Sequence, residues 1–242
     1  MSAAPDTTML IATLSRLISG VKHIAVGASS PIPGTAALLV RRQSQGATRV
    51  TVLGSRVNNS FTDGGRELFD CAAQGRIDVF FLGGGQIDGE ANINLVGTGG
   101  YPQSKVRFPG SFGSAYLYFL VPRVILFREE HSRRVFVPKV EFVSAPGWSP
   151  PEVYRPGGPV AMLTSLCLFS FDKARHRFVL ESLHPGHTLE EVRDNTGFAF
   201  DVPDTIATTP MPDDAMRAAI RAVGPEIAET YPQFAARLAA AA

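Results

Sequence analysis

The first half of the chain alternates between two apolar patterns. In three segments the apolar residues recur every three or four positions, which is the spacing of one face of a helix. These segments are 8–18, 35–43 and 65–75. Short apolar runs lie between them and predict buried strands at 23–29, 49–55 and 78–84. Strands that alternate with helices of about ten residues predict right-handed crossovers, and so an open, mainly parallel α/β sheet with helices on both faces.

The second half follows a different pattern. Residues 123–145 and 160–183 read as pairs of strands joined by polar turns, so we expect an antiparallel extension of the sheet. Two helices are predicted at the end of the chain, near 213–223 and 226–241, and the Pro- and Gly-rich segment 144–159 predicts a long surface loop. We expect one domain over residues 1–242, with 1–7 disordered.

Composition narrows the function classes. The chain has 242 residues and 45% of them are hydrophobic, which is enough for one sizeable core. Its 23 Lys and Arg residues are scattered and nearly cancel 22 Asp and Glu residues, so we expect no nucleic-acid partner. No basic leader and no apolar run of about 18 residues occurs, so we expect no membrane association and a cytoplasmic location. Cys71 and Cys167 lie in unrelated contexts, which predicts neither a disulfide nor a metal site.

Glycine-rich loops at three strand ends are the candidates for chemistry. In open α/β sheets ligands bind outside the carboxyl ends of the strands, and here these ends lead into 26–34, 53–59 and 81–95. Successive glycines let a ligand approach the backbone amides, which can hold a phosphate or a developing oxyanion. The fingerprints GxGxxG, GxxxxGK[ST] and GxSxG are all absent from the sequence. By composition alone, a plain tight turn at Gly83–Gly85 is as good an interpretation as a binding loop.

Several motifs together favour the binding loop. The stretches "GGGQIDGEANIN" (83–94), "KVRFPGSFGSA" (105–115), "VEFVSAPGW" (140–148) and "LHPGHTLEEVRDNTGF" (183–198) occur in this order. In that order they resemble the beta subunit of the glutaconate CoA-transferase type, a two-subunit, class I CoA-transferase family. The segment "AVGASSPIPGTAALLVRR" (25–42) is similar to the N-terminal loop and helix of that subunit. The resemblance covers about residues 8–205.

The resemblance implies a fold, a partner and a substrate class. The fold would be CoA-transferase-like, and the partner would be a homologous alpha subunit in a heterodimer or heterotetramer. The substrate would be an acyl-CoA thioester in the cleft between the subunits. Coenzyme A would enter as part of that substrate, with no permanently bound cofactor.

One feature of that family is missing. A glutamate at the end of the second strand forms the enzyme-bound CoA ester in these transferases, whereas Gly54 or Ser55 matches it here, and no acid lies between Val50 and Thr62. Amide donors and a proton carrier still suffice to polarise a thioester carbonyl and stabilise an enolate. Relatives without the glutamate decarboxylate a glutaconyl-type CoA thioester or hydrolytically open a ring on an acyl-CoA. A lyase or hydrolase variant is therefore the leading hypothesis, ahead of conventional CoA transfer and of a non-catalytic CoA-binding subunit.

The candidate site residues follow from this alignment. Ser55, Arg56 and Asn58 occupy the place of the missing glutamate and are the candidate catalytic residues, with Arg56 able to bind a carboxylate in bidentate fashion. The residues expected to bind substrate or CoA lie in three loops: Gly54; Gly83, Gly84, Gly85 and Gln86; and Gly110, Ser111, Phe112 and Gly113.

Other polar residues have structural interpretations. The segment 128–134 predicts a solvated hairpin turn, with contact between Arg133 or Arg134 and CoA phosphates as the lesser alternative. His184 and His187 are expected in a turn before a helix that begins at Thr188. Asp88 is expected to cap its own glycine turn, and Asn92 and Asn94 to brace the same loop.

Overall fold

The computed structural model describes residues 6–240, which form two compact units. The first runs to Phe81 and resumes at Pro210, and the second is Leu82–Thr209. Of the segment 1–7, for which the sequence predicts disorder, residues 1–5 lie outside the described residues. Asp6 and Thr7 are described: Asp6 accepts hydrogen bonds from the backbone amides of Thr8 and Met9, and Thr7 begins the first helix.

The first unit contains three parallel strands and six helices among its described residues. The strands, in the order β3-β1-β2, are β1 (His23–Val26), β2 (Arg49–Val52) and β3 (Val79–Leu82). The helices are α1 (Thr7–Leu17), α2 (Pro31–Gln43), α3 (Gly64–Ala73), α6 (Asp214–Ala222), α7 (Gly224–Ala228) and α8 (Pro232–Ala240). The predicted strand–helix alternation is therefore confirmed.

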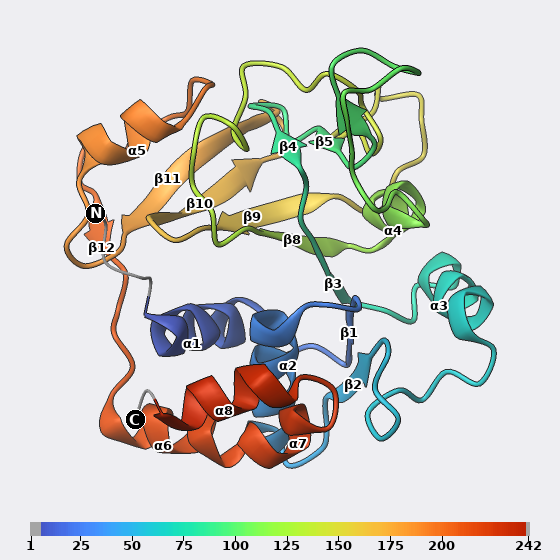
Figure 1. Cartoon of the computed structure of the whole chain (residues 1–242), viewed down its shortest axis with the longest axis vertical. Helices are drawn as coiled ribbons and strands as arrows, with labels where there is room; N and C mark the ends of the chain where they lie inside the picture. Colours follow the sequence, from blue (N-terminus) through green and yellow to red (C-terminus); the bar gives the residue numbers. More distant parts are fainter. Residues whose placement is uncertain (1–5, 241–242) are drawn as a thin grey trace. The chain divides into compact units, whose positions relative to one another are not determined.

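Helices from both ends of the chain pack together in the first unit (Figure 1). On α1 the side chains of Leu10, Ile11 and Leu14 are fully buried, as their three- and four-residue spacing predicts. The second predicted terminal helix is divided into α7 and α8. Pro232 begins α8, because proline has no amide to donate within a continuing helix but fits the first helical position.

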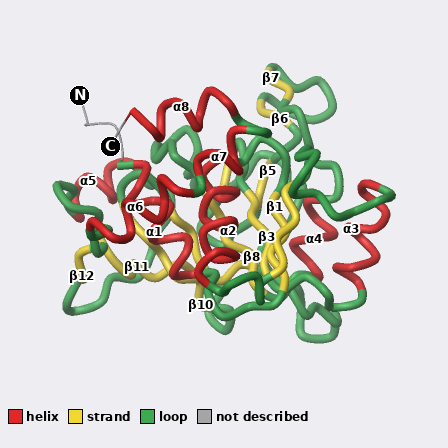
Figure 2. The backbone as a smooth tube through the Cα atoms, turned by 90° about the horizontal axis from the view of Figure 1, so that it is seen from below, coloured by secondary structure: helices red, strands yellow, loops and turns green. Residues whose placement is uncertain are grey.

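The second unit holds the antiparallel extension, together with short strand pairs and two helices. Its main strands, in the order β12-β11-β10-β9-β8, are β8 (Arg123–Phe127), β9 (Pro159–Leu163), β10 (Cys167–Asp172), β11 (Arg177–Leu183) and β12 (Ala207–Thr208). The short strands are β4 (Gln86–Ile87), β5 (Ile93–Asn94), β6 (Gly97–Thr98) and β7 (Val106–Arg107), and the helices are α4 (Ser114–Leu120) and α5 (Leu189–Asn195). Figure 2 shows β6 and β7 in a loop-rich part of the chain.

Pairing in the second unit confirms the antiparallel extension for 160–183 and corrects the prediction for 123–145. Strands β9, β10 and β11 are antiparallel, but β8 pairs in parallel with β9. Residues 128–158 contain no helix or strand. Instead of folding back on β8, this segment forms single bridges to the β4–β5 pair, from Phe136 to Ile87 and from Ala145 to Ile93. Burial of Phe136 and Ala145 there satisfies the apolar pattern that suggests a hairpin.

The segment 128–134 also differs from the expected solvated turn. Arg133 and Arg134 are exposed, but His131 is buried, and its two ring nitrogens lie 2.8 and 2.9 Å from the hydroxyls of Thr164 and Thr196. A neutral imidazole between two hydroxyls is satisfied without solvent. This polar segment therefore contains one residue, His131, that belongs to the core.

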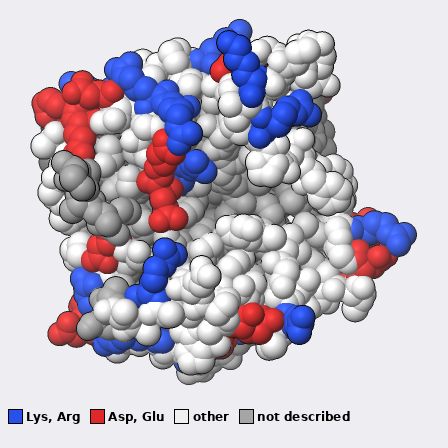
Figure 3. Space-filling model, viewed as in Figure 1, with Lys and Arg blue, Asp and Glu red and all other residues white. Residues whose placement is uncertain are grey.

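Surface charge agrees with the composition. On the face drawn in Figure 3, basic and acidic side chains are interspersed between wide areas of other residues, in keeping with a net charge of +1.

Cys71 and Cys167 are both buried and form no disulfide bond, and burial raises the pKa of the Cys167 thiol to about 12. Within residues 6–240, no helix is both long enough and apolar enough to cross a membrane.

Candidate functional site

The glycine loop between β3 and β4 is built so that side chains are excluded from it. A Cβ on Gly83 would meet the carbonyl oxygen of Phe127 at 3.0 Å, and one on Gly84 would meet the carbonyl oxygen of Gln86 at 2.8 Å. A Cβ on Gly85 would come within 2.3 Å of the Phe108 ring. Atoms of this protein therefore fill the space that a side chain would take at these three positions, so each of them needs glycine. The approach of a ligand to the backbone amides here stays a prediction.

This loop borders a cavity of about 610 Å³ within the second unit. Its lining combines the glycine loop with apolar and charged side chains from other segments of that unit. The lining residues are Gly83, Gly84, Gly85, Gln86, Leu95, Thr98, Val106, Phe108, Pro109, Arg128, Arg134, Val137 and Glu141. A cavity with an apolar wall and a few polar groups is the usual form of a small-molecule site.

A second cavity in the same unit lies on other residues. It has a volume of about 490 Å³ and is lined mainly by polar side chains, among them Asp88, Glu90 and Lys139. Gly83–Gly85 do not line it. The cavity beside the glycine loop is therefore the candidate functional site, and we call it the glycine-loop cavity.

Gln86 is part of this cavity, but its side-chain amide is already engaged. Its Oε1 accepts hydrogen bonds from Asn94 Nδ2 at 2.8 Å and from the backbone amide of Glu141 at 3.1 Å. Its Nε2 donates to Glu141 Oε1 at 3.0 Å. The predicted binding of substrate or CoA by Gln86 stays a prediction. The observed contacts show that Gln86 also holds Glu141.

Glu141 is a cavity residue that the sequence motifs do not single out. Its carboxylate lines the glycine-loop cavity and accepts hydrogen bonds from Gln86 and from the backbone amide of Gly99, the latter at 2.6 Å. The available signal is a lone acid inside the apolar run "VEFV". Those partners come from segments about 40 to 55 residues away, so the sequence alone does not reveal them.

Two arginines give the same cavity a basic side. Arg128 and Arg134 both line it, and both form ion pairs with Glu130, at 3.6 and 2.6 Å. Burial opposes ionisation of Glu130, but hydrogen bonds from Ser132 and Arg134 and the two positive charges outweigh it and lower the pKa of that carboxyl. Arg128 Nε is buried and has no hydrogen-bond partner within the described part of the chain. The arrangement can attract an anionic group of a ligand.

The predicted loop 110–113 contributes less to the cavity than expected. Pro109 lines it, whereas Gly110, Ser111 and Phe112 are exposed and are not among its lining residues. Gly113 has a φ of 68° and is the residue before α4. Its left-handed backbone explains the glycine, because other residues adopt this conformation only with strain. Ligand binding by residues 110–113 stays a prediction.

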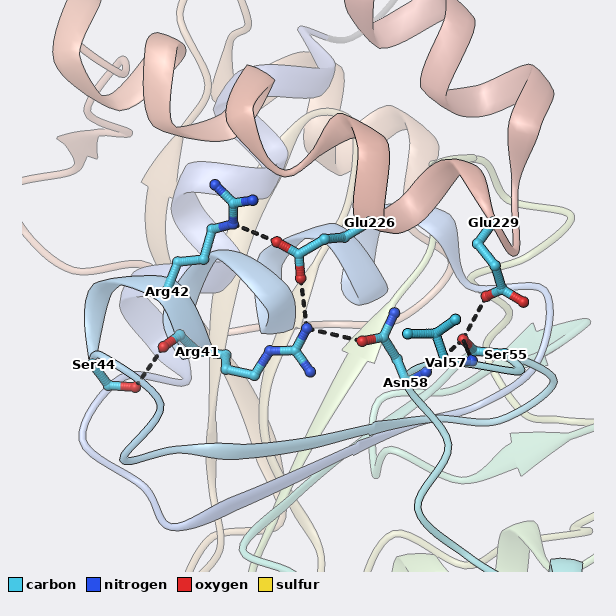
Figure 4. A network of polar contacts seen from close by, with 8 residues as sticks. All are labelled: Arg41, Arg42, Ser44, Ser55, Val57, Asn58, Glu226 and Glu229. Carbon is cyan, nitrogen blue, oxygen red and sulfur yellow. Dashed lines mark hydrogen bonds and ion pairs between the residues drawn. The ribbon is translucent and has the colours of Figure 1, made fainter.

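The loop after β2 is held by carboxylates from the C-terminal helices of the first unit (Figure 4). Ser55 Oγ donates a hydrogen bond to Glu229 at 2.6 Å and accepts from the backbone amides of Val57 and Asn58 at 3.2 and 2.8 Å. Gly54 has a φ of 88°, which suits the tight turn that begins there. The hydroxyl of Ser55 is thus fully engaged in shaping the loop.

Asn58 is tied into the same network. Its side-chain oxygen accepts a hydrogen bond from Arg41 at 2.8 Å, and Glu226 forms ion pairs with both Arg41 and Arg42. Burial opposes ionisation of Glu226, but the two arginines outweigh it and lower its pKa. Arg56 is exposed, and its backbone amide donates to Glu229 at 2.9 Å. The catalytic roles suggested for Ser55, Arg56 and Asn58 stay predictions.

The remaining polar residues take the structural roles expected of them. Asp88 Oδ1 accepts hydrogen bonds from the backbone amides of Glu90 and Asn92, so it caps its own turn. Asn94 is buried and its side-chain oxygen accepts from the backbone amides of Val96 and Gly97, which braces the loop. Thr188 caps α5 through the backbone amide of Glu191, at 3.2 Å.

This fold is that of a known class of protein. The sequence model of the family described as "Coenzyme A transferase" matches residues 8–195, so the chain belongs to that family.

Two curated relatives are B subunits of CoA-transferases by name. The chain is 36% identical over 165 residues to the B subunit of the 3-oxoadipate CoA-transferase of Pseudomonas knackmussii, a match that covers 66% of this chain and 63% of the relative. It is 33% identical to the B subunit of the glutaconate CoA-transferase of Acidaminococcus fermentans, over 59% of this chain and 55% of the relative. The matched region thus spans about three fifths of the length of these relatives.

Two solved structures share the fold over most of the chain. The decarboxylase AibA/AibB matches with a TM-score of 0.80 and 24% identity, over 98% of this chain and 99% of that one. IpdAB of Rhodococcus jostii matches with a TM-score of 0.79 and 26% identity, over 89% of this chain and 92% of that one. The similarity extends well beyond the segments that carry the sequence motifs.

Proposed function

We propose that this chain is the B-type component of a two-subunit enzyme that acts on an acyl-CoA thioester. Its reaction is decarboxylation or hydrolytic cleavage of a carbon–carbon bond, and CoA transfer is the alternative. A homologous A-type subunit completes the pocket in a heterodimer or heterotetramer. Coenzyme A is a part of the substrate. Relatives named as B subunits and the paired names AibA/AibB and IpdAB support the assembly.

The observation that carries the choice of reaction is the composition of the loop after β2. No acid lies between Val50 and Thr62, and the hydroxyl of Ser55 is engaged with Glu229 and two backbone amides. A transferase that works through an acyl-enzyme needs a carboxylate nucleophile at this place, whereas enolate chemistry needs amide donors and a proton carrier. For the second kind of reaction the glycine-loop cavity supplies two arginines and Glu141.

Conventional CoA transfer has one specific observation in its favour. Glu229 reaches the loop after β2 from the end of α7, so a carboxylate does lie beside Ser55. The hydrogen bonds from Ser55, Arg56 and Thr230 lower the pKa of this carboxyl, with the Ser55 hydroxyl as the largest cause. A less basic carboxylate is a weaker nucleophile, and its oxygens already accept three hydrogen bonds, so we rank transfer second.

The experiment compares three outcomes on the complex purified after coexpression with an A-type subunit. Glutaconyl-CoA and 3-oxoadipyl-CoA are offered with and without acetate as an acceptor acid. We expect release of carbon dioxide or of a cleaved acid, no CoA exchange into acetate, and no inactivation by borohydride in the presence of the thioester. A CoA ester trapped on a glutamate of this chain, with Glu229 as the first position to map, would establish transfer and contradict the proposed reaction.

A non-catalytic role is separated by a further comparison. If this chain only supports its partner, the A-type subunit alone retains turnover when this chain is left out. We expect turnover only in the assembled complex, because the glycine-loop cavity belongs to this chain.

A further inference from the structure

Among the residues that line the glycine-loop cavity, Glu141 is the one with a carboxylate. The other charged lining residues are Arg128 and Arg134, and both are already paired with Glu130. Within residues 6–240, Glu141 forms no ion pair with a lysine, arginine or histidine. Its carboxylate is therefore not neutralised by a neighbouring cation.

Two hydrogen bonds hold this carboxylate, one from a side chain of β4 and one from the backbone after β6. Gln86 Nε2 donates to Oε1 at 3.0 Å, and the Gly99 amide donates to Oε2 at 2.6 Å. Gly99 has a φ of 89°, and a Cβ there would lie 2.6 Å from the Lys105 side chain, so glycine suits this conformation. The amide that holds Oε2 is thus presented by a backbone that other residues adopt only with strain.

The orientation of Gln86 is itself defined by buried neighbours. Its Oε1 accepts from Asn94 Nδ2, which also donates to the carbonyl of Gly97 at 2.8 Å, and Asn94 is fully buried. The Glu141 backbone amide donates to the same Oε1. With two donors on the oxygen, the Nε2 group must face Glu141. Asn94 and Gln86 therefore form a buried support for one carboxylate at the cavity wall.

The Glu141 carboxylate can accept further hydrogen bonds. An ionised carboxylate has about four lone-pair positions, and the two hydrogen bonds to Gln86 and Gly99 occupy two of them. The residue is exposed, so water can exchange protons with it. An oriented and exposed carboxyl group that has no ion-pair partner, at the wall of a pocket, has the properties of a general acid–base.

We propose that Glu141 is the catalytic proton carrier of the glycine-loop cavity and that Gln86 and Asn94 are its positioning residues. This inference rests on the proposed function. In the decarboxylation the bond to the substrate carboxylate breaks, carbon dioxide leaves, and the electron pair passes into the thioester as an enolate. The protonated carboxyl of Glu141 gives its proton to the enolate carbon and becomes a carboxylate, which takes up a proton from solvent. In the hydrolytic reaction the Glu141 carboxylate takes a proton from the water whose oxygen adds to a substrate carbonyl. The carbon–carbon bond then breaks, the new acid leaves, and the same proton passes to the enolate carbon.

The kinetic test uses Glu141→Gln in the coexpressed complex, with glutaconyl-CoA and 3-oxoadipyl-CoA as probes. Since general acid–base catalysis contributes about 10²- to 10⁴-fold, we expect kcat to fall about 100-fold or more, with KM changed by less than about threefold. In the plot of kcat/KM against pH, the wild-type complex should show a change in slope caused by the ionisation of a carboxyl group (the carboxyl limb). This carboxyl limb should be missing in Glu141→Gln. Glu152→Gln is the matched control, because Glu152 is exposed and does not line the cavity.

Positioning by Gln86 and Asn94 gives a different kinetic signature. Asn94→Asp replaces the amide group that donates to Gln86 with a carboxyl group. Gln86→Glu does the same to the amide group that donates to Glu141. We expect the carboxyl limb of the pH profile to move in these variants, while Glu141→Gln removes it. A purely structural role for Gln86 would lower the melting temperature and leave the limb in place.

A second measurement does not depend on turnover. Glu141 in the wild-type complex is labelled with a carbodiimide and an amine, with and without acetyl-CoA, and the label is mapped by mass spectrometry. We expect acetyl-CoA to protect Glu141 and to leave Glu152 unchanged. Equal labelling in both conditions would overturn the proposal, as would a folded Glu141→Gln complex that keeps kcat within about threefold of wild type.

Failure of the proposed function would be visible in the wild-type complex, before any variant is compared. In that case the wild-type complex would transfer CoA to acetate through a trapped glutamyl ester, or would not turn over either thioester, and the role of Glu141 would fall with it. Failure of the Glu141 proposal alone would leave wild-type cleavage intact and appear only in the variant and in the labelling.

Discussion

Neighbouring glycines in the cavity wall differ in what they contact. A Cβ on Gly84 would meet a backbone oxygen of Gln86 and the side chain of Ile93, both at 2.8 Å, whereas the atoms nearest to one on Gly85 all belong to the Phe108 ring. Backbone and buried Ile93 cannot move away easily, but a partly exposed ring can. At the scale of single residues, Gly84 therefore supports the fold and Gly85 shapes the cavity.

Alanine at each position should separate these roles. We expect Gly84→Ala to lower the free energy of unfolding by about 1–3 kcal/mol, the usual cost of overpacking. Gly85→Ala should change stability less and weaken acetyl-CoA binding to the complex, because the displaced Phe108 ring enters the cavity. Chemical denaturation and calorimetric titration measure the two effects. Equal losses of stability in both variants would contradict the distinction.

Two buried histidines give the second unit a dependence on pH. Burial lowers the pKa of His131 to about 3 and that of His184 to about 4. In the unfolded chain both titrate near 6.5, so the unfolded state binds more protons as pH falls below about 6.5. The contribution of these residues to stability is complete above that pH and is lost as pH falls toward 4 and 3.

The consequence can be measured on one variant. Each histidine should make the free energy of unfolding fall by up to about 1.4 kcal/mol per pH unit below its unfolded pKa. We expect His131→Gln to be less stable at pH 7 but to have a shallower dependence between pH 6.5 and 5, by about one proton. Denaturant titrations at several pH values check this slope. An unchanged slope would show that His131 is not buried in its neutral form.

At the scale of elements, the C-terminal helices hold the loop after β2. Glu229 follows α7 directly and joins Ser55 and the Arg56 amide, while Glu226 within α7 pairs with Arg41 and Arg42 of α2. The contacts of Glu229 connect residues more than 170 positions apart in the sequence. The shape of the loop after β2 therefore depends on an element from the end of the chain.

Glu229→Ala should loosen this loop without unfolding the unit. Its carboxylate is the acceptor for the Ser55 hydroxyl and the Arg56 amide, so both lose their partner in the variant. We expect faster amide hydrogen exchange at residues 55–58 and unchanged exchange in α1, measured by mass spectrometry. Glu181→Gln, an exposed acid on β11, is the control. Unaltered exchange at 55–58 would mean that the backbone alone holds the loop.

The sequence predicted the elements more completely than the contacts between them. Local spacing was enough for α1, for β9 to β11 and for the caps made by Asp88 and Thr188, since each depends on neighbours within a few residues. Local spacing gave the wrong pairing for 123–145, because an apolar pattern does not show which other segment the apolar residues will pack against. It also missed Glu141 and Glu229, whose partners lie 42 to 174 residues away.

At the scale of the whole molecule, exposed apolar side chains lie close to the glycine-loop cavity. Tyr101 and Val143 are 62% and 46% exposed, and the ring of Tyr101 lies 5.0 Å from that of Phe142. Both residues are next to segments that supply cavity residues, Thr98 to Val106 and Glu141. Exposed apolar side chains that cluster are typical of interaction surfaces. If the proposed A-type subunit binds here, we expect Tyr101 and Val143 to contact it.

This gives a prediction for assembly. Expressed alone, the chain should self-associate or be poorly soluble, whereas coexpression with an A-type subunit should yield a stable hetero-oligomer in copurification and size-exclusion chromatography. The double variant Tyr101→Ser, Val143→Ser should weaken that hetero-oligomer, because the apolar area that it covers is smaller. Met211→Ser is the control, since Met211 is 45% exposed but belongs to the other unit. A well-behaved, active monomer without a partner would contradict the assembly, and equal weakening by Met211→Ser would place the contact elsewhere.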